Sequence, residues 1–373
     1  MALKSDFKLP PLSLNPGVII LGVLGILEGL AGSYLYVITG HELMGILHGA
    51  KVYRLTSIRA FEVKNFTAKE KQSTAYQDDQ LLLGMVNEVL SSPHLYFSYG
   101  CTLTTSSQMM PQTSKIDTLV GEACRRQPSR SRLRKLLWEA EDQNFVWNYH
   151  FASPLIAAGL HSFVVPLLHG YIGFITSQDL NGHRLDVCLV ARRSRHRYGT
   201  RYNRRGVDAR GDVANEVHSE QIAIVRPLAG CGLKATGCSV ALVRGSIPIY
   251  WQTPPSATQW KPTLQLVPGR DATEPFARHF RRLHEKYTGS VSCVNLIDQD
   301  GKEAPLYHAF HEHMDKLNKS DPGIANLTSF DFHHGCGNSS ATYARGLATL
   351  LKQVDRYLLE QVLSLRRPLT SPL

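Results

Sequence analysis

Short apolar runs separated by turn residues fill the first part of the chain, up to about residue 161. Runs rich in β-branched, Leu and aromatic residues predict four strands, at Val18–Leu24, Ser33–Thr39, Lys51–Phe61 and Leu95–Leu103. Before the fourth run, apolar residues recur at helical spacing and a proline then ends the pattern: Leu82, Met85, Val86, Val89 and Pro93. This mixture predicts an α+β module.

The stretch Val18–Ile38 is about long enough to cross a bilayer. Glu28 lies near its centre, and a buried charge there would cost about 2.5–3.5 kcal/mol. Glycines also recur along it. We therefore predict two buried strands with a turn near Glu28.

Strands and helices alternate in the second part of the chain. Predicted strands lie at Leu185–Val190, Val240–Arg244 and Val291–Ile297. One helix face is marked by Phe276, Phe280, Leu283 and Tyr287, and a second helix is predicted at Ser340–Val362, with Ser339 or Ser340 as its cap. Alternation of this kind favours an α/β domain. We expect an α+β domain at 1–161, an α/β domain at 162–363 and a tail at 364–373 that matches no pattern.

Composition describes an ordinary globular protein, because 43% of the 373 residues are hydrophobic and 19% are charged. The net charge of +10 favours polyanions, whether nucleic acid, anionic lipid or a phosphorylated substrate. A polar segment near 108–134 carries several arginines and is predicted to be an exposed basic loop. Seven scattered cysteines without a C-x-x-C pair, and an N-terminus without a signal-peptide pattern, predict a cytosolic protein.

The segment 192–208 reads RRSRHRYGTRYNRRGVD, and eight arginines fall between Arg192 and Arg210. A planar guanidinium matches phosphate oxygens with two parallel hydrogen bonds and keeps its charge at every accessible pH. A solvated charged face and a nucleic-acid surface are the alternatives. Glycines and aromatic residues between the arginines indicate a shaped turn, and no nucleic-acid-binding motif accompanies them. A phosphate site for a small molecule or a lipid is therefore favoured.

The block 192–222 resembles the signature of the Sac-domain phosphoinositide phosphatases. Other segments resemble that family in the same order, from Gly17 to Val362: FVWN at 145–148, PLLHGY at 166–171, RGSIP at 244–248, NLI at 295–297 and FDFH at 330–333. Glu216 and His218 depart from the family, which has an aromatic residue and a carboxylate there.

The resemblance implies hydrolysis of phosphatidylinositol phosphates, such as the 4- and 3-monophosphates, on the cytosolic face of endomembranes. It implies no cofactor, no metal and no nucleic-acid partner; a phosphoinositide or an anionic membrane surface is the expected partner. We assign phosphate binding to four arginines: Arg197, Arg201, Arg204 and Arg205. Five residues are expected to support them: Asp208, Glu220, Arg244, Asp331 and His333.

The family's chemistry uses a Cys-x5-Arg loop whose thiolate attacks phosphorus, placed after the helix that corresponds to Ser340–Val362. The sequence ends near there, so we expect an incomplete cysteine-phosphatase-like α/β domain that is inactive as it stands. A non-catalytic phosphoinositide-binding or regulatory protein is the alternative. Two chance matches to the spacing, Cys124–Arg130 and Cys238–Arg244, lack the glycine-rich turn that such a loop needs. Histidines near 308–313 and 333–336 do not form a zinc-ligand set.

Overall fold

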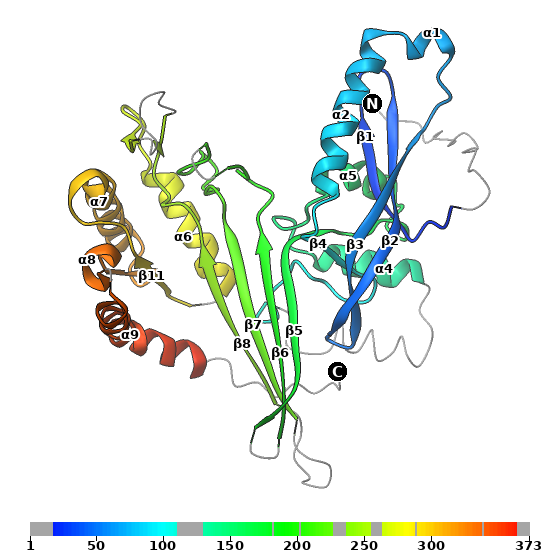
Figure 1. The fold of residues 1–373 in the computed structure, drawn as a ribbon. Coiled ribbons are helices and arrows are strands. Elements are labelled where there is room, and N and C mark those ends of the chain that lie inside the picture. Colours follow the sequence, from blue (N-terminus) through cyan, green and yellow to red (C-terminus); the bar gives the residue numbers. More distant parts are fainter. Residues whose placement is uncertain are drawn as a thin grey trace.

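The computed structural model describes residues 18–109, 130–180, 183–200, 203–226, 236–254, 263–287, 289–337 and 339–363 (Figure 1). Arg201, residues 110–129 of the predicted basic loop, Cys124 and the tail 364–373 lie outside the described residues. The predictions made for them stay predictions.

Eight antiparallel strands form one large sheet in which every neighbour in space is also a neighbour in sequence. The strands are β1 Gly22–Glu28, β2 Ser33–Leu47, β3 Ala50–Glu62, β4 Leu95–Ser98, β5 Leu168–Leu180, β6 His183–Arg193, β7 Val217–Arg226 and β8 Thr236–Arg244. Figure 1 shows β5 to β8 as long, side-by-side arrows that extend away from β1 to β3. The α+β character predicted from the sequence is confirmed.

β1 and β2 form the antiparallel hairpin that the glycine-rich stretch predicted. The turn between them is held from outside, because Asp79 accepts hydrogen bonds from the Leu30 and Ala31 N–H groups at 2.6 and 3.0 Å. The Tyr34 hydroxyl donates to the same carboxylate at 3.0 Å. Among the described helices, none is both long and apolar enough to span a membrane.

The helices of the first part are α1 Ala68–Lys71, α2 Thr74–Leu90, α4 Arg130–Ala140 and α5 Tyr149–Ala157. The predicted helix is present as α2, and Leu82 and Val86 of its apolar pattern are partly buried. Leu83 and Leu90 are buried, whereas Met85 and Val89 are 60% and 49% exposed. Asp79 is buried on α2 and contacts the β1–β2 turn, so it helps to determine which side of the helix faces the sheet. A pattern of apolar residues alone cannot predict that polar contact.

The second part adds a hairpin and an α/β unit to the sheet. Its elements are β9 Trp251–Gln252, β10 Gln265–Leu266, α6 Thr273–Tyr287, β11 Val291–Asn295, the 3-10 turn Gly301–Glu303, α7 Ala304–Ser320, β12 Ala325–Ser329, α8 Phe332–Cys336 and α9 Ser340–Leu363. β11 and β12 pair in parallel, with α7 as the connection. Phe276, Phe280 and Leu283 are buried on α6 as predicted, and the Ser339 hydroxyl caps α9 by accepting from the Thr342 N–H.

The large sheet continues across residue 161, where the sequence suggested a domain boundary. β4 pairs with β5 through Leu95–His169 and Tyr96–Leu168. The cluster of buried residues that includes Leu47, Phe145 and Ile222 also draws on both sides of that position. The division into two domains at this residue stays a prediction.

Candidate functional site: an arginine-lined cavity

The arginine segment forms one wall of a cavity of about 650 Å³. Three of the arginines predicted to bind phosphate line it, together with a fourth arginine from another segment: Arg197, Arg204, Arg205 and Arg270. Tyr250 and Trp251 add aromatic surface. The structure thus brings three residues of the predicted set together in one concave site.

The backbone of the arginine segment is fixed against the segment that follows β8. The Gly206 N–H donates to the Ser246 hydroxyl at 2.8 Å, and the Val207 N–H donates to the Ile249 carbonyl at 3.1 Å. Gly206 has φ +68°, and a Cβ there would lie 2.4 Å from the Ile249 oxygen. Only glycine allows so close a backbone approach without strain.

Two of the arginines are held within the cavity wall by contacts to the protein itself. One Arg197 Nη2–H donates to the Arg205 carbonyl at 2.7 Å, while the Arg197 Nε is buried without a hydrogen-bond partner among the described residues. The Arg205 guanidinium lies 5.0 Å from the centroid of the Trp251 ring. A buried donor without a partner costs free energy, which an acceptor in the cavity would recover.

Asp208 is the one carboxylate among the described residues that line the cavity. Its Oδ1 accepts from the N–H groups of Arg210 and Asp212 at 2.9 and 3.0 Å and so shapes the turn 208–212. α6 holds the same turn, because Arg278 donates to the Ala209 carbonyl at 2.9 Å and Arg282 pairs with Asp212 at 2.7 Å. The cavity therefore keeps a large excess of positive charge.

Apart from Asp208, the supporting residues that the sequence predicted lie elsewhere. Arg244 is exposed at the end of β8. Asp331 caps α8 by accepting from the His334 N–H at 2.8 Å, and this hydrogen bond lowers the pKa of Asp331. His333 contacts Asp298 at 2.7 Å, and that hydrogen bond raises the pKa of His333. Neither Asp331 nor His333 is among the described residues that line the cavity.

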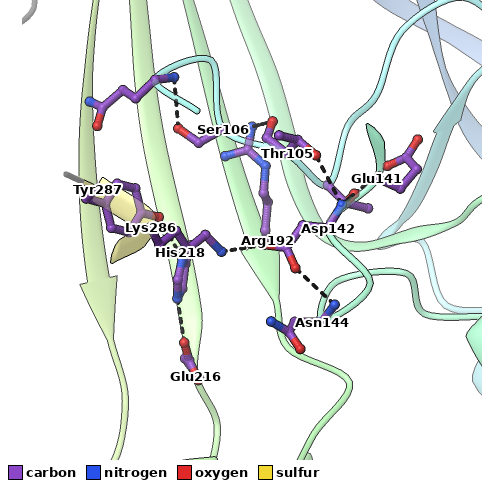
Figure 2. A network of polar contacts seen from close by, with 12 residues as sticks. Thr105, Ser106, Glu141, Asp142, Asn144, Arg192, Glu216, His218, Lys286 and Tyr287 are labelled. Carbon is purple, nitrogen blue, oxygen red and sulfur yellow. Dashed lines mark hydrogen bonds and ion pairs between the residues drawn. The ribbon is translucent and has the colours of Figure 1, made fainter. Parts of the chain in front are cut away.

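Glu220 is buried beside a network of polar contacts that includes Arg192, which Figure 2 shows. It forms an ion pair with Arg192 at 2.8 Å, with side-chain exposures of 0% and 3%. The Ser107 N–H donates to both carboxylate oxygens of Glu220. Glu220 thus offsets one arginine of the segment, as the sequence suggested, but it does so away from the cavity.

His218 and Glu216, the two departures from the family pattern, contact each other in the same network (Figure 2). Since a carboxylate only accepts, the His218 Nε2–H donates to Glu216 at 2.5 Å, and Nδ1 accepts from the Tyr287 hydroxyl at 2.7 Å. Burial lowers the pKa of His218. Burial opposes ionisation of Glu216 as well, but the hydrogen bond from His218 lowers the pKa of that carboxyl to about 2.

Lys286 on α6 extends this network to the loop between α4 and α5 by pairing with Asp142 at 2.5 Å. These groups line a second cavity of about 430 Å³. Burial raises the pKa of the neighbouring Glu141 to about 7. Nothing in the local sequence marks Lys286, Asp142 or Glu141, because the fold joins them from distant segments.

Among the described cysteines, those with a shifted pKa are all less acidic than a free thiol. Burial raises the pKa of three thiols, to about 11 for Cys101 and about 12 for Cys188 and Cys293. Cys238 lies in β8, where its neighbours pair with β7 residue by residue as far as Arg244. An extended strand cannot wrap its amides around a phosphate, so the prediction that Cys238–Arg244 is a chance match is supported.

The fold and the site define a mixed sheet-and-helix protein with an arginine-lined cavity. The model of the SacI homology domain family matches residues 21–337, and the chain belongs to that family. It is 34% identical to "Phosphatidylinositol-3-phosphatase SAC1-B" of Danio rerio over 318 residues, 85% of this chain and 49% of the relative. It is 33% identical to "Phosphoinositide phosphatase SAC8" of Arabidopsis thaliana over 325 residues, 86% of this chain and 49% of the relative. The chain spans about half the length of these relatives.

Proposed function

We propose that this chain binds the phosphorylated inositol headgroup of a membrane lipid in the cavity lined by Arg197, Arg204 and Arg205. The observation that carries the proposal is the concentration of guanidinium groups around one cavity whose single described carboxylate is engaged by the backbone. Guanidinium groups bind phosphate through charge-assisted, paired hydrogen bonds. Membership of the SacI homology family supports phosphatidylinositol phosphates, such as the 4- and 3-monophosphates, as the ligand class.

The site of action in this proposal is an anionic membrane surface on the cytosolic face of endomembranes. The net charge of +10 favours anionic lipid, and each basic residue near such a surface contributes about 1 kcal/mol. Nucleic acid is not part of the proposal, because the arginines line a cavity of headgroup size and do not follow an extended groove.

We assign the part after residue 161 to an incomplete α/β cysteine-phosphatase-like domain. The parallel β11–α7–β12 unit supports this assignment. The chain as given is proposed to bind without releasing phosphate, since Cys238 lies in a strand and three other thiols are held protonated by burial. A non-catalytic phosphoinositide-binding or regulatory role is the second candidate, and the same observation favours it.

Vesicle co-sedimentation tests the binding proposal. Vesicles that contain 5% phosphatidylinositol 4-phosphate should bind the chain more tightly than vesicles of equal charge made with phosphatidylserine, and binding should weaken as salt rises. Arg205→Gln should reduce the preference for the phosphoinositide. Arg345→Gln, which removes the same charge from exposed α9, should leave that preference unchanged. Equal binding to both vesicles, or tighter binding to duplex DNA at matched salt, would refute the proposal.

A further inference from the structure

Arg270 reaches the arginine-lined cavity by way of a hairpin that the sequence did not predict. β9 and β10 pair through Gln252–Gln265 and Trp251–Leu266, and the Val267 N–H donates to the Tyr250 carbonyl at 2.9 Å. The chain therefore leaves β10 beside Tyr250. The Arg270 guanidinium lies 4.8 Å from the centroid of the Tyr250 ring.

The cavity thus holds two guanidiniums backed by aromatic rings, Arg205 on Trp251 and Arg270 on Tyr250. Stacking on a ring reduces the conformational freedom of a guanidinium that binding must otherwise remove. The two arginines come from separate segments of the chain. One phosphate group is too small to occupy a cavity of about 650 Å³.

The exposure of the lining arginines divides them into two pairs. Arg197 and Arg205 are partly buried, whereas Arg204 and Arg270 are exposed. None of the ion pairs found among the described residues involves Arg204 or Arg270. The mouth of the cavity therefore carries positive charge that no described carboxylate neutralises.

We propose that Arg270, together with Arg204, forms an outer subsite for a second phosphate group, so that the cavity distinguishes headgroups with two phosphomonoesters from headgroups with one. This proposal rests on the proposed function, in which Arg197 and Arg205 hold the first phosphate. Arg270 is a specificity-determining residue, because its N–H groups gain hydrogen bonds only when the inositol ring carries a second phosphate.

Calorimetric titration with two soluble probes tests the subsite: glycerophosphoinositol 4-phosphate and glycerophosphoinositol 4,5-bisphosphate. The unsubstituted chain should bind the bisphosphate about tenfold more tightly, because a charge-assisted hydrogen-bond pair is worth about that factor. Arg270→Gln should remove that advantage while changing monophosphate affinity by less than about twofold. Arg270→Lys, which keeps the charge but loses the fork, should retain only part of the advantage.

Arg205→Gln and Arg345→Gln separate this proposal from the binding proposal. Arg205→Gln should weaken both probes, and Arg345→Gln should weaken neither. If Arg270→Gln weakens both probes equally or affects neither, the second subsite is refuted while the headgroup site stands. If the unsubstituted chain binds neither probe, both proposals fail. Inorganic phosphate and vesicles with phosphatidylinositol 4,5-bisphosphate, run in parallel, show whether the free headgroup chemistry or the lipid surface supplies the affinity.

Discussion

Arg192 and Glu220 face each other across the neighbouring strands β6 and β7, 2.8 Å apart, with side chains that are 3% and 0% exposed. The Arg192 Nε–H also donates to the Leu103 carbonyl at 2.7 Å. The pair therefore joins the sheet to the loop that follows β4. A buried ion pair of this kind is costly to break, because removing one partner leaves the other charged and unpaired.

Arg192→Met should lower the free energy of unfolding by about 3–5 kcal/mol. The Glu220 carboxylate would then remain buried without its ionic partner. Urea unfolding followed by circular dichroism measures the loss. Adding Glu220→Leu to Arg192→Met should recover part of the stability. The exposed pair Arg54–Glu42 is the control, and Arg54→Met should cost less than about 1 kcal/mol. Similar losses at both pairs would contradict the buried assignment.

The protein should lose stability in mild acid because His169 is buried. Burial lowers the pKa of His169 to about 4, whereas the unfolded side chain titrates near 6.5. Between these two pH values the unfolded state binds more protons, so the free energy of unfolding falls as pH falls. The contribution of His169 to the free energy of unfolding is fully present above pH 6.5. His169→Gln should flatten the decline in the free energy of unfolding, measured by urea unfolding between about pH 6.5 and pH 4, by on the order of 1 kcal/mol for each pKa unit.

Glu141 should act in the opposite direction. Its folded pKa of about 7 lies above the unfolded value of 4.5, so the folded state takes up the proton first as pH falls. Glu141 therefore lowers the free energy of unfolding at pH above 7, and this destabilisation is lost as pH falls from about 7 towards 4.5. Glu141→Gln should raise the urea midpoint most at pH 8 and least at pH 4.5. The stability difference between variant and parent should grow as pH falls for His169→Gln and as pH rises for Glu141→Gln. Differences that change with pH in the same direction would show that burial does not set these pKa values.

Gly206→Ala should weaken both stability and anion binding. A methyl group would lie 2.4 Å from the Ile249 oxygen at φ +68°, and strain of this kind costs about 1–3 kcal/mol. Because Gly206 adjoins Arg205, its displacement also moves a cavity arginine. Gly84→Ala is the matched control: nothing lies within 4 Å of its added carbon in helix α2, and helix propensity should raise stability by up to about 1 kcal/mol. Thermal unfolding of the two variants should therefore shift in opposite directions.

Phosphate release from phosphatidylinositol 4-phosphate should stay at background for the chain as given. Catalysis needs a thiolate and donors aimed at the transferring phosphoryl group. Cys238→Ser and Cys124→Ser should leave malachite-green readings unchanged. Robust release that either substitution abolishes would show that one of the two Cys-x5-Arg spacings is functional.

The predictable features were those that a local pattern determines. Apolar runs and helical spacing predicted seven of the described strands (β1 to β4, β6, β8 and β11), the β1–β2 turn and the buried face of α6, and the arginine segment was recognised from its residues. The same patterns did not predict β5, β7, β9, β10 or β12. The contact of Asp79 on α2 with the β1–β2 turn was not predictable, because its partners lie 48 and 49 residues away in the chain. Arg270 was missed because only the β9–β10 pairing brings it to the cavity. Lys286 and Asp142 lie 144 residues apart and have no common signal in the sequence.

The sequential strand order of the large sheet has a consequence for how the protein is made. Each strand from β2 to β8 pairs with the strand that precedes it in the chain. During synthesis, a new strand can therefore add to a template that has already emerged from the ribosome, without waiting for a distant partner. The parallel pair β11–β12 differs, because it closes only after α7 has been made. We expect the hairpins β1–β2–β3 and β5–β6–β7–β8 to gain protection from hydrogen exchange before that pair does, since short closures precede long ones. β4 joins β3 and β5 across longer stretches of chain and is not expected to precede the pair.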